Sequence, residues 1–216
     1  MRLKTFALFL FGSLFSGNMA FADDCLITSP VINFKETYHG YSVSRSLNKL
    51  ALKSYNVGSH KGSGEVLGLT ISNLKTDLQM EVESRQLSRN LWCSTPKSIN
   101  FKFGQIEKVL VYIASEIRAG SCEDRTTLQH ELQHVAFTEA AILSARSRIV
   151  PAIQQALKGR TYKGRTVAGS QAELQRAVSD SIRKQIDIII QEMETRHASI
   201  DTADNYERTA AICRGR

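Results

Sequence analysis

Proline and glycine are scarce in this sequence, with three prolines and thirteen glycines in 216 residues. So few chain-breaking residues leave little room for long linkers and exclude a collagen-like repeat. No stretch beyond the N-terminus approaches the roughly 18 consecutive apolar residues of a membrane-spanning helix, which excludes a multi-pass membrane protein. The hydrophobic content of 42% and the charged content of 23% are typical of an ordinary globular domain.

The N-terminus has the pattern of a cleavable signal peptide. A positively charged start precedes an apolar stretch over residues 6–15, and the small residues Ala20 and Ala22 occupy the positions that a signal peptidase reads. About ten apolar residues are too few to cross a bilayer, which takes roughly 20. We therefore expect a signal peptide over residues 1–22 and a periplasmic or secreted protein whose mature chain, residues 23–216, forms a single domain.

The sequence lacks a Cys-x-x-Cys motif, which argues against a thiolate zinc site or a redox motif. All four cysteines lie in the expected mature chain, and an even number in an oxidising compartment favours two disulfides. Four cysteines allow three pairings, and their spacing does not choose among them. Our working prediction is Cys93–Cys122 and Cys25–Cys213.

The charge is basic, with 28 Lys and Arg residues against 21 Asp and Glu residues and a net charge of +7. The expected signal peptide removes two basic residues, so the mature chain has 26 basic and 21 acidic residues and a net charge of +5. This excess serves solubility or favours weak contact with anionic envelope polymers. The basic residues do not cluster with aromatic ones, so we expect no nucleic-acid partner.

The N-terminal part of the chain predicts mainly strands. The apolar residues Ile99, Phe101 and Phe103 alternate with polar ones, a pattern that predicts a strand with one buried face and one exposed face. We expect an antiparallel sheet there, preceded by one helix and one turn. The expected helix covers residues 44–55, the turn 58–64, and the strands 66–72, 78–82, 98–103 and 109–113.

The C-terminal part predicts helices. Asp124 or Thr126 can cap a helix that ends at Pro151, followed by a short helix over residues 152–157 and a basic loop over residues 159–169. The remainder is a long amphipathic helix, opened by a capping box of Ser170 and Glu173. Its apolar stripe consists of Leu174, Val178, Ile182, Ile186, Ile189 and Met193. Strands followed by helices, without a linker, predict an α+β fold.

The sequence His-Glu-Leu-Gln-His lies in the first of these helices and carries the chemistry. His130 and His134 are four residues apart, so on a helix both imidazoles face the same way and can bind one metal ion. Zinc would lower the pKa of a bound water to about 7. Glu131 would accept the proton of that water and later deliver it to the leaving amine. The alternative is a chance pair on a surface helix, although a shuffled chain would show this motif on the order of once in a hundred times.

A catalytic zinc site needs a third protein ligand. The pattern HExxHxxGxxH is absent, because Phe137 and Ala140 occupy its glycine and histidine positions. Three candidates remain. Glu139 lies on the wrong face of an unbroken helix, whereas His197 continues the apolar stripe of the long helix and Asp201 follows four residues later. The other histidines, His39 and His60, are expected in surface or loop positions.

The chain as a whole resembles a bacterial secreted family of unknown function whose members are described as predicted secreted zinc-dependent proteases. The resemblance includes Tyr41-Ser-Val and a helix with Leu50, Gly64…Gly68-Leu-Thr70, Cys93 before alternating strands, the HELQH helix, and Ile200-Asp201-Thr-Ala-Asp-Asn-Tyr206. In that family the last segment follows a pattern like Tyr-Asp-x-x-Thr-x-His-Gly. Asp201 matches its aspartate, while Ile200, Asp204 and Tyr206 replace its tyrosine, threonine and histidine.

The resemblance implies a zincin-like fold, with an active-site helix and a long C-terminal helix, and favours Asp201 as the third ligand. A His–His–Asp set is similar to that of the aspzincins, in which a tyrosine after the aspartate helps to stabilise the oxyanion. Tyr206 is the candidate for that role here, although its spacing from Asp201 differs and it could instead be a packed aromatic residue.

We therefore expect a hydrolase, a zinc metalloprotease that acts as a monomer on a peptide or protein substrate. An extended substrate would pair with residues 109–113 as an edge strand. Two other functions remain open. One is a non-catalytic envelope protein with a structural or vestigial metal site, and the other is a metal-dependent amidase that acts on the cell wall.

Overall fold

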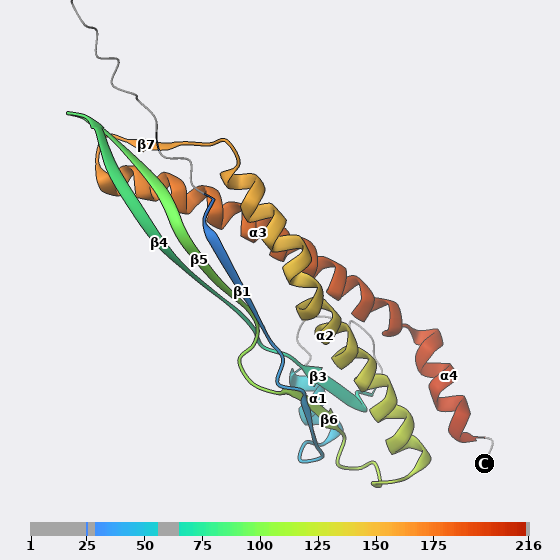
Figure 1. Ribbon diagram of the computed structural model, residues 1–216. Helices are drawn as coiled ribbons and strands as arrows, with labels where there is room; N and C mark the ends of the chain where they lie inside the picture. The colour runs from blue at the N-terminus through green and yellow to red at the C-terminus, as the bar shows by residue number, and fades with distance from the viewer. Residues whose placement is uncertain (1–24, 26–28, 56–64, 215–216) are drawn as a thin grey trace, which may run out of the picture.

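The computed structural model describes residue 25 and residues 29–55 and 65–214. The expected signal peptide, the expected turn over 58–64 and His60 lie outside these residues. The described part of the chain mixes helices and strands, which confirms the α+β class (Figure 1). In chain order the elements are β1 (Val31–Thr37), β2 (Tyr41–Ser44), α1 (Lys49–Tyr55), β3 (Gly68–Ile71), β4 (Leu74–Ser88), β5 (Leu91–Gln105), β6 (Val109–Ile113), α2 (Cys122–Leu157), β7 (Tyr162–Gly164), α3 (Val167–Ile200) and α4 (Ala203–Arg214).

The strands form two mixed sheets. The large sheet has the order β1-β5-β4, with β7 pairing to β5, and the small sheet has the order β2-β6-β3. The expected antiparallel pairing is found among the four predicted strands, because β4 pairs with β5 and β3 pairs with β6 in antiparallel fashion. The expectation of one purely antiparallel sheet was wrong, because these strands lie in two sheets and β1 and β2, which were not predicted, pair with β5 and β6 in parallel. Both parallel strands come from an N-terminal segment that pairs with strands more than sixty residues away, and local alternation carries no information about such a partner.

The predicted strand over residues 109–113 is confirmed as β6, but it is not an edge strand. It lies between β2 and β3, and Val109, Val111 and Ile113 are fully buried. Within the described residues the edges of the small sheet are β2 and β3. The expected role of β6 in pairing with a substrate is therefore wrong.

The alternation predicted for β5 is confirmed. Ile99, Phe101 and Phe103 are buried, whereas Asn100 and Lys102 point to the other face. There Asn100 accepts a hydrogen bond of 2.9 Å from Asn33 and Lys102 pairs with Asp77 at 3.2 Å. One face of the large sheet is thus polar, and the other packs against helices.

The helix α2 runs without interruption for 36 residues, so the predicted end at Pro151 was wrong. Ile149 and Ile153, on either side of the proline, are fully buried. Their packing favours a continuous helix and offsets the backbone hydrogen bond that Pro151 cannot donate. The N-cap is Ser121, whose hydroxyl accepts a hydrogen bond of 3.1 Å from the Asp124 N–H, and not Asp124 or Thr126.

The long helix α3 is confirmed, but it begins earlier than the predicted capping box. Its N-cap is Thr166, whose hydroxyl accepts a hydrogen bond of 3.0 Å from the Gly169 N–H. Ser170 is instead fully buried and lies 2.7 Å from the Ser94 hydroxyl of β5. The expected basic loop before it contains the strand β7.

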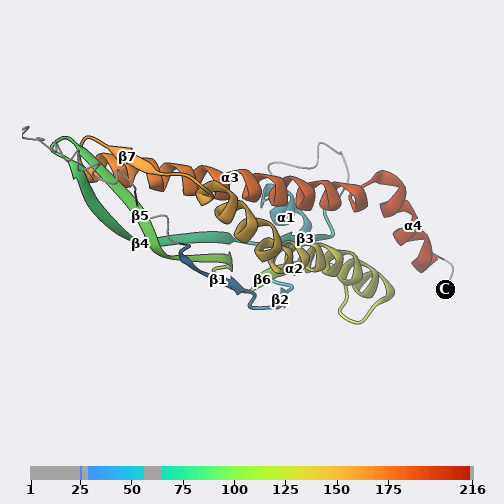
Figure 2. The same cartoon turned by 45° about the horizontal axis from the view of Figure 1, so that its top comes forward.

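Two apolar clusters divide the interior, and α2 contributes to both. Leu128, Leu132 and Val135 pack on the small sheet, while Ile142 and Ile149 pack with the large sheet and α3. In both views α2 and α3 lie side by side and α4 lies at the opposite end of an elongated molecule from the tip of β4 and β5 (Figure 2). No helix in residues 29–55 or 65–214 is long and apolar enough to span a membrane.

The four cysteines form two disulfides, but the predicted pairing was wrong. The bonds are Cys25–Cys93 and Cys122–Cys213. Cys122 opens α2 and α4 returns alongside this end of the helix, which brings Cys213 to it. Two disulfides fit a protein that folds in an oxidising compartment.

Candidate metal centre

Two histidines of α2 form one side of the candidate centre. His130 and His134 are buried, and their Nε2 atoms lie 3.3 Å apart. Helical periodicity explains this approach, since residues four apart lie one above the other on a helix face. This part of the motif behaves as the sequence predicted.

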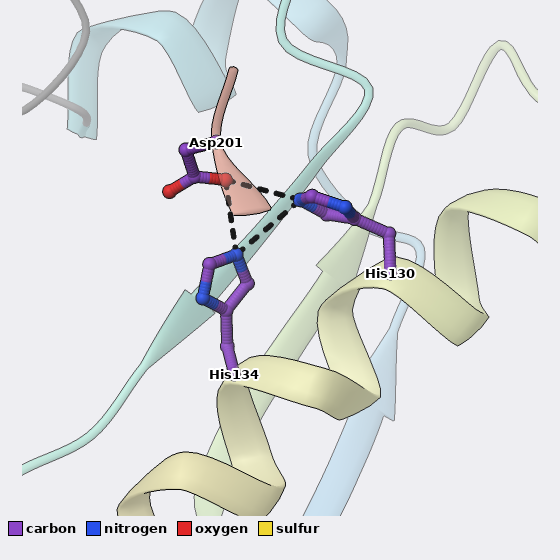
Figure 3. A group of neighbouring side chains, drawn as sticks. All are labelled: His130, His134 and Asp201. Atoms are coloured by element: carbon purple, nitrogen blue, oxygen red, sulfur yellow. Dashed lines mark hydrogen bonds and ion pairs between the residues drawn. The ribbon is translucent and has the colours of Figure 1, made fainter. Parts of the chain in front are cut away.

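Asp201 completes the group from the far end of α3. It is the C-cap of that helix, and its N–H donates a hydrogen bond of 3.2 Å to the His197 carbonyl. Its Oδ1 atom lies 3.1 Å from His130 Nε2 and 3.2 Å from His134 Nε2 (Figure 3). Burial raises the pKa of Asp201, but the hydrogen bonds with His130 and His134 outweigh it and hold the pKa well below its usual value.

The three ligand atoms have the spacing that a metal ion requires. Around zinc, with bonds of about 2.0–2.1 Å, the corners of a regular tetrahedron lie about 3.3–3.4 Å apart. The observed separations of 3.1, 3.2 and 3.3 Å are close to that edge length. Two imidazoles and one carboxylate also match the donor types of zinc sites. His130, His134 and Asp201 therefore form a group able to bind a metal ion.

His197, the alternative third ligand, lies behind the group. Its Nδ1 is 2.6 Å from Nδ1 of His134, the imidazole nitrogen that faces away from Asp201. Burial, and then the charge of His134, lowers the pKa of His197 to about 4, so its ring is neutral at neutral pH. When His134 Nε2 binds a metal, its Nδ1–H can donate to His197, which fixes the orientation of the ligand ring.

Glu131 lies beside the group on the side of β3. Its side chain is buried, and the Thr70 hydroxyl donates a hydrogen bond of 2.8 Å to its Oε2 atom. Burial raises the pKa of Glu131, and the Thr70 hydrogen bond and the charges of the histidines oppose this shift. A carboxyl group with a raised pKa is suited to both accepting and returning a proton.

Tyr206 reaches the group from α4. Its hydroxyl donates a hydrogen bond of 2.8 Å to Asp201 Oδ1, and its ring centroid lies 5.1 Å from that of His130. Burial, followed by the hydrogen bond and charge of Asp201, raises the pKa of Tyr206, so the phenol stays protonated. The residue is nevertheless 42% exposed and lies at the solvent side of the group.

The remaining sequence candidates lie elsewhere. Glu139 lies beside Tyr38, since burial, and then the charge of Glu139 and a hydrogen bond with it, raise the pKa of Tyr38. It is not part of the metal group. His39 is exposed, as expected, and its backbone N–H donates a hydrogen bond to Gln105 Oε1.

Thr70 and Gly68 contact Glu131 but were not among the predicted site residues. A Cβ atom added at Gly68 would lie 2.6 Å from Glu131 Oε1. The only signal that included them was the segment Gly68-Leu-Thr70 in the family resemblance, which carries no chemistry by itself.

Comparison with known proteins adds no relative to this picture. No protein-family model, no curated protein and no solved structure matches the chain.

Proposed function

We propose that the chain is a zinc-dependent metallopeptidase with a zincin-like fold. The observation that carries the proposal is the convergence of His130, His134 and Asp201 at zinc-like spacing, next to the buried carboxylate of Glu131. The resemblance to secreted zinc-dependent proteases supports the same family and the same ligand set.

The roles of the residues follow from their positions. His130, His134 and Asp201 would hold the zinc ion, which when bound supplies a Lewis acid that polarises the scissile carbonyl and promotes ionisation of the attacking water. Glu131 would accept the proton of that water and deliver it to the leaving amine. Tyr206, whose hydroxyl bonds to Asp201 Oδ1 in the structure, would give up this bond and donate to the developing oxyanion instead.

An extended peptide would pair with β3 in place of β6. The strand β3 is an edge of the small sheet in the described residues, and its Thr70 contacts Glu131. A substrate strand added to this edge would bring its carbonyl next to the carboxylate through backbone hydrogen bonds.

The proposed function is tested by metal analysis and one matched pair of variants. Zinc content is measured in the purified protein, and hydrolysis of a casein-derived peptide mixture is compared for wild type, Glu131→Gln and Glu139→Gln. Glu131→Gln should retain zinc and lose at least 100-fold in rate, on the order of a lost general base. Glu139→Gln makes the same change on the same helix and should retain both zinc and activity.

The other outcomes separate the alternatives. Zinc without Glu131-dependent hydrolysis of peptides or of cell-wall amides would refute the enzyme and favour a non-catalytic envelope protein. Hydrolysis of cell-wall amides alone would favour the amidase. We also propose export through the signal peptide with cleavage after Ala22, which N-terminal sequencing of the secreted or periplasmic protein tests.

A further inference from the structure

We propose that Thr70 is a positioning residue, which holds the Glu131 carboxylate in the orientation needed for proton transfer at the metal centre. This inference rests on the proposed function, and it adds a role for β3 that the HExxH motif does not contain.

The first support is the hydrogen bonding of Thr70. Its hydroxyl lies 2.8 Å from Glu131 Oε2 and 3.2 Å from the Glu131 carbonyl oxygen. A hydroxyl has one proton to donate, and the shorter distance and the negative charge both favour the carboxylate as its acceptor. One oxygen of the carboxylate is thereby fixed to the sheet.

The second support is the close approach of Gly68 to the same side chain. A Cβ atom there would lie 2.6 Å from Glu131 Oε1, 2.8 Å from Cγ and 2.9 Å from Cδ. Real Cβ contacts are not this short, so any other residue would displace the carboxylate. Only glycine leaves room for Glu131 in its present rotamer.

The geometry of a strand joins these two observations. Residues two apart on a strand point to the same face, so Gly68 and Thr70 both face Glu131 while Leu69 points to the opposite face. Gly68 provides the space and Thr70 provides the hydrogen bond. The strand β3 thus positions the Glu131 carboxylate through these two residues.

The kinetic test uses Thr70→Val and Thr70→Ser in the zinc-loaded protein. Valine keeps the shape and removes the hydroxyl, so kcat should fall about 10- to 100-fold, which is the effect of one lost hydrogen bond to a charged group. KM and zinc content should stay unchanged, and serine should restore most of the rate. Thr195→Val is the control, because that hydroxyl is exposed and donates only to the Gln191 carbonyl within α3 among the contacts described.

A second test does not depend on activity. Thermal unfolding of the zinc-free protein is measured for Thr70→Val, Glu131→Ala and the double variant. If the hydroxyl acts on the carboxylate, Thr70→Val should lower Tm in the wild type and cause no further decrease in Glu131→Ala. Additive decreases in Tm, or a Thr70→Val enzyme with normal kcat, would overturn the inference.

The two tests also separate this inference from the proposed function. If the wild type has no Glu131-dependent hydrolysis, the proposed function fails, and the unfolding cycle still decides whether Thr70 holds Glu131. If hydrolysis depends on Glu131 but Thr70→Val behaves as wild type in both tests, only the positioning role fails.

Discussion

Removal of the disulfide between α2 and α4 should weaken zinc binding as well as the fold. The bond joins Cys122 and Cys213 across 91 residues. The loop-entropy relation gives about 4.6 kcal/mol of stability at 25 °C for a loop of this length. For a protein of this size, such a loss corresponds to a decrease in Tm of roughly 9–18 °C.

The effect on zinc follows from the weak attachment of α4. None of the residues of α4 that the structure describes is buried, so the disulfide provides much of its attachment to α2. Tyr206 lies on α4 and bonds to Asp201. Loss of such a partner of a metal ligand typically lowers metal affinity about 10- to 100-fold, and we expect a loss in this range.

The assay compares two pairs of serine substitutions. Cys25 and Cys93 close a loop of 68 residues, which gives a similar stability term of about 4.4 kcal/mol, but neither residue is near the metal group. Zinc affinity is measured by competition with a chelator, and Tm by circular dichroism on the zinc-free proteins. Only the Cys122→Ser, Cys213→Ser protein should lose affinity.

Equal zinc affinities in the two double variants would refute this reasoning, whether both were weakened or neither was. Tyr206→Phe with both disulfides intact should reproduce the affinity loss, because it removes the same hydrogen bond to Asp201. A normal affinity in Tyr206→Phe would show that α4 acts on the site by another route.

Three further predictions concern the ligands and the fold. Asp201→Ala should lose stoichiometric zinc in metal analysis after dialysis, whereas His197→Ala should retain it with about 10- to 100-fold lower affinity; the reverse result would make His197 the ligand. The pKa of Asp124 is lowered, since hydrogen bonds from Gly120 and Arg45 outweigh the effect of burial, so its contribution is present above the unfolded pKa of about 4 and is lost as pH falls through the folded pKa. Asp124→Asn should cost about 1–3 kcal/mol at pH 7 in urea unfolding and progressively less as pH falls below about 4, and a loss that does not change with pH would contradict this. Ile149→Ala should cost about 2–5 kcal/mol, because the side chain is fully buried, and a loss below 1 kcal/mol in the same assay would contradict its role in the core.

Features encoded by local periodicity were predictable from the sequence. The spacing of His130 and His134 requires only that the segment be helical, and the apolar stripe of α3 correctly oriented the end of that helix toward α2. Together these two patterns restricted the third candidate ligand to a few residues, among which Asp201 is the one that the structure brings close to the Nε2 atoms of both histidines.

Features that depend on long-range packing were not predictable. The disulfide partners depend on which helix ends meet, and the direction of β1 depends on a partner 67 residues away, since Val31 pairs with Ser98. The predicted helix boundaries were wrong for a different reason. Pro151 and Ser170 have strong local preferences, but packing of their neighbours in the core outweighed them.

Asp201 lies far along α3 from the part of that helix that is buried in the core. Ile189 is the last buried residue of α3, and Asp201 lies twelve residues further along, about 18 Å away at the rise of an α-helix. A tilt of α3 by only about 3° about this point would move Asp201 by about 1 Å, several times the tolerance of roughly 0.2 Å for a metal–ligand distance. A small change in the tilt of α3 would therefore decide whether Asp201 reaches the histidines, which makes the packing of α3 on α2 a determinant of metal affinity.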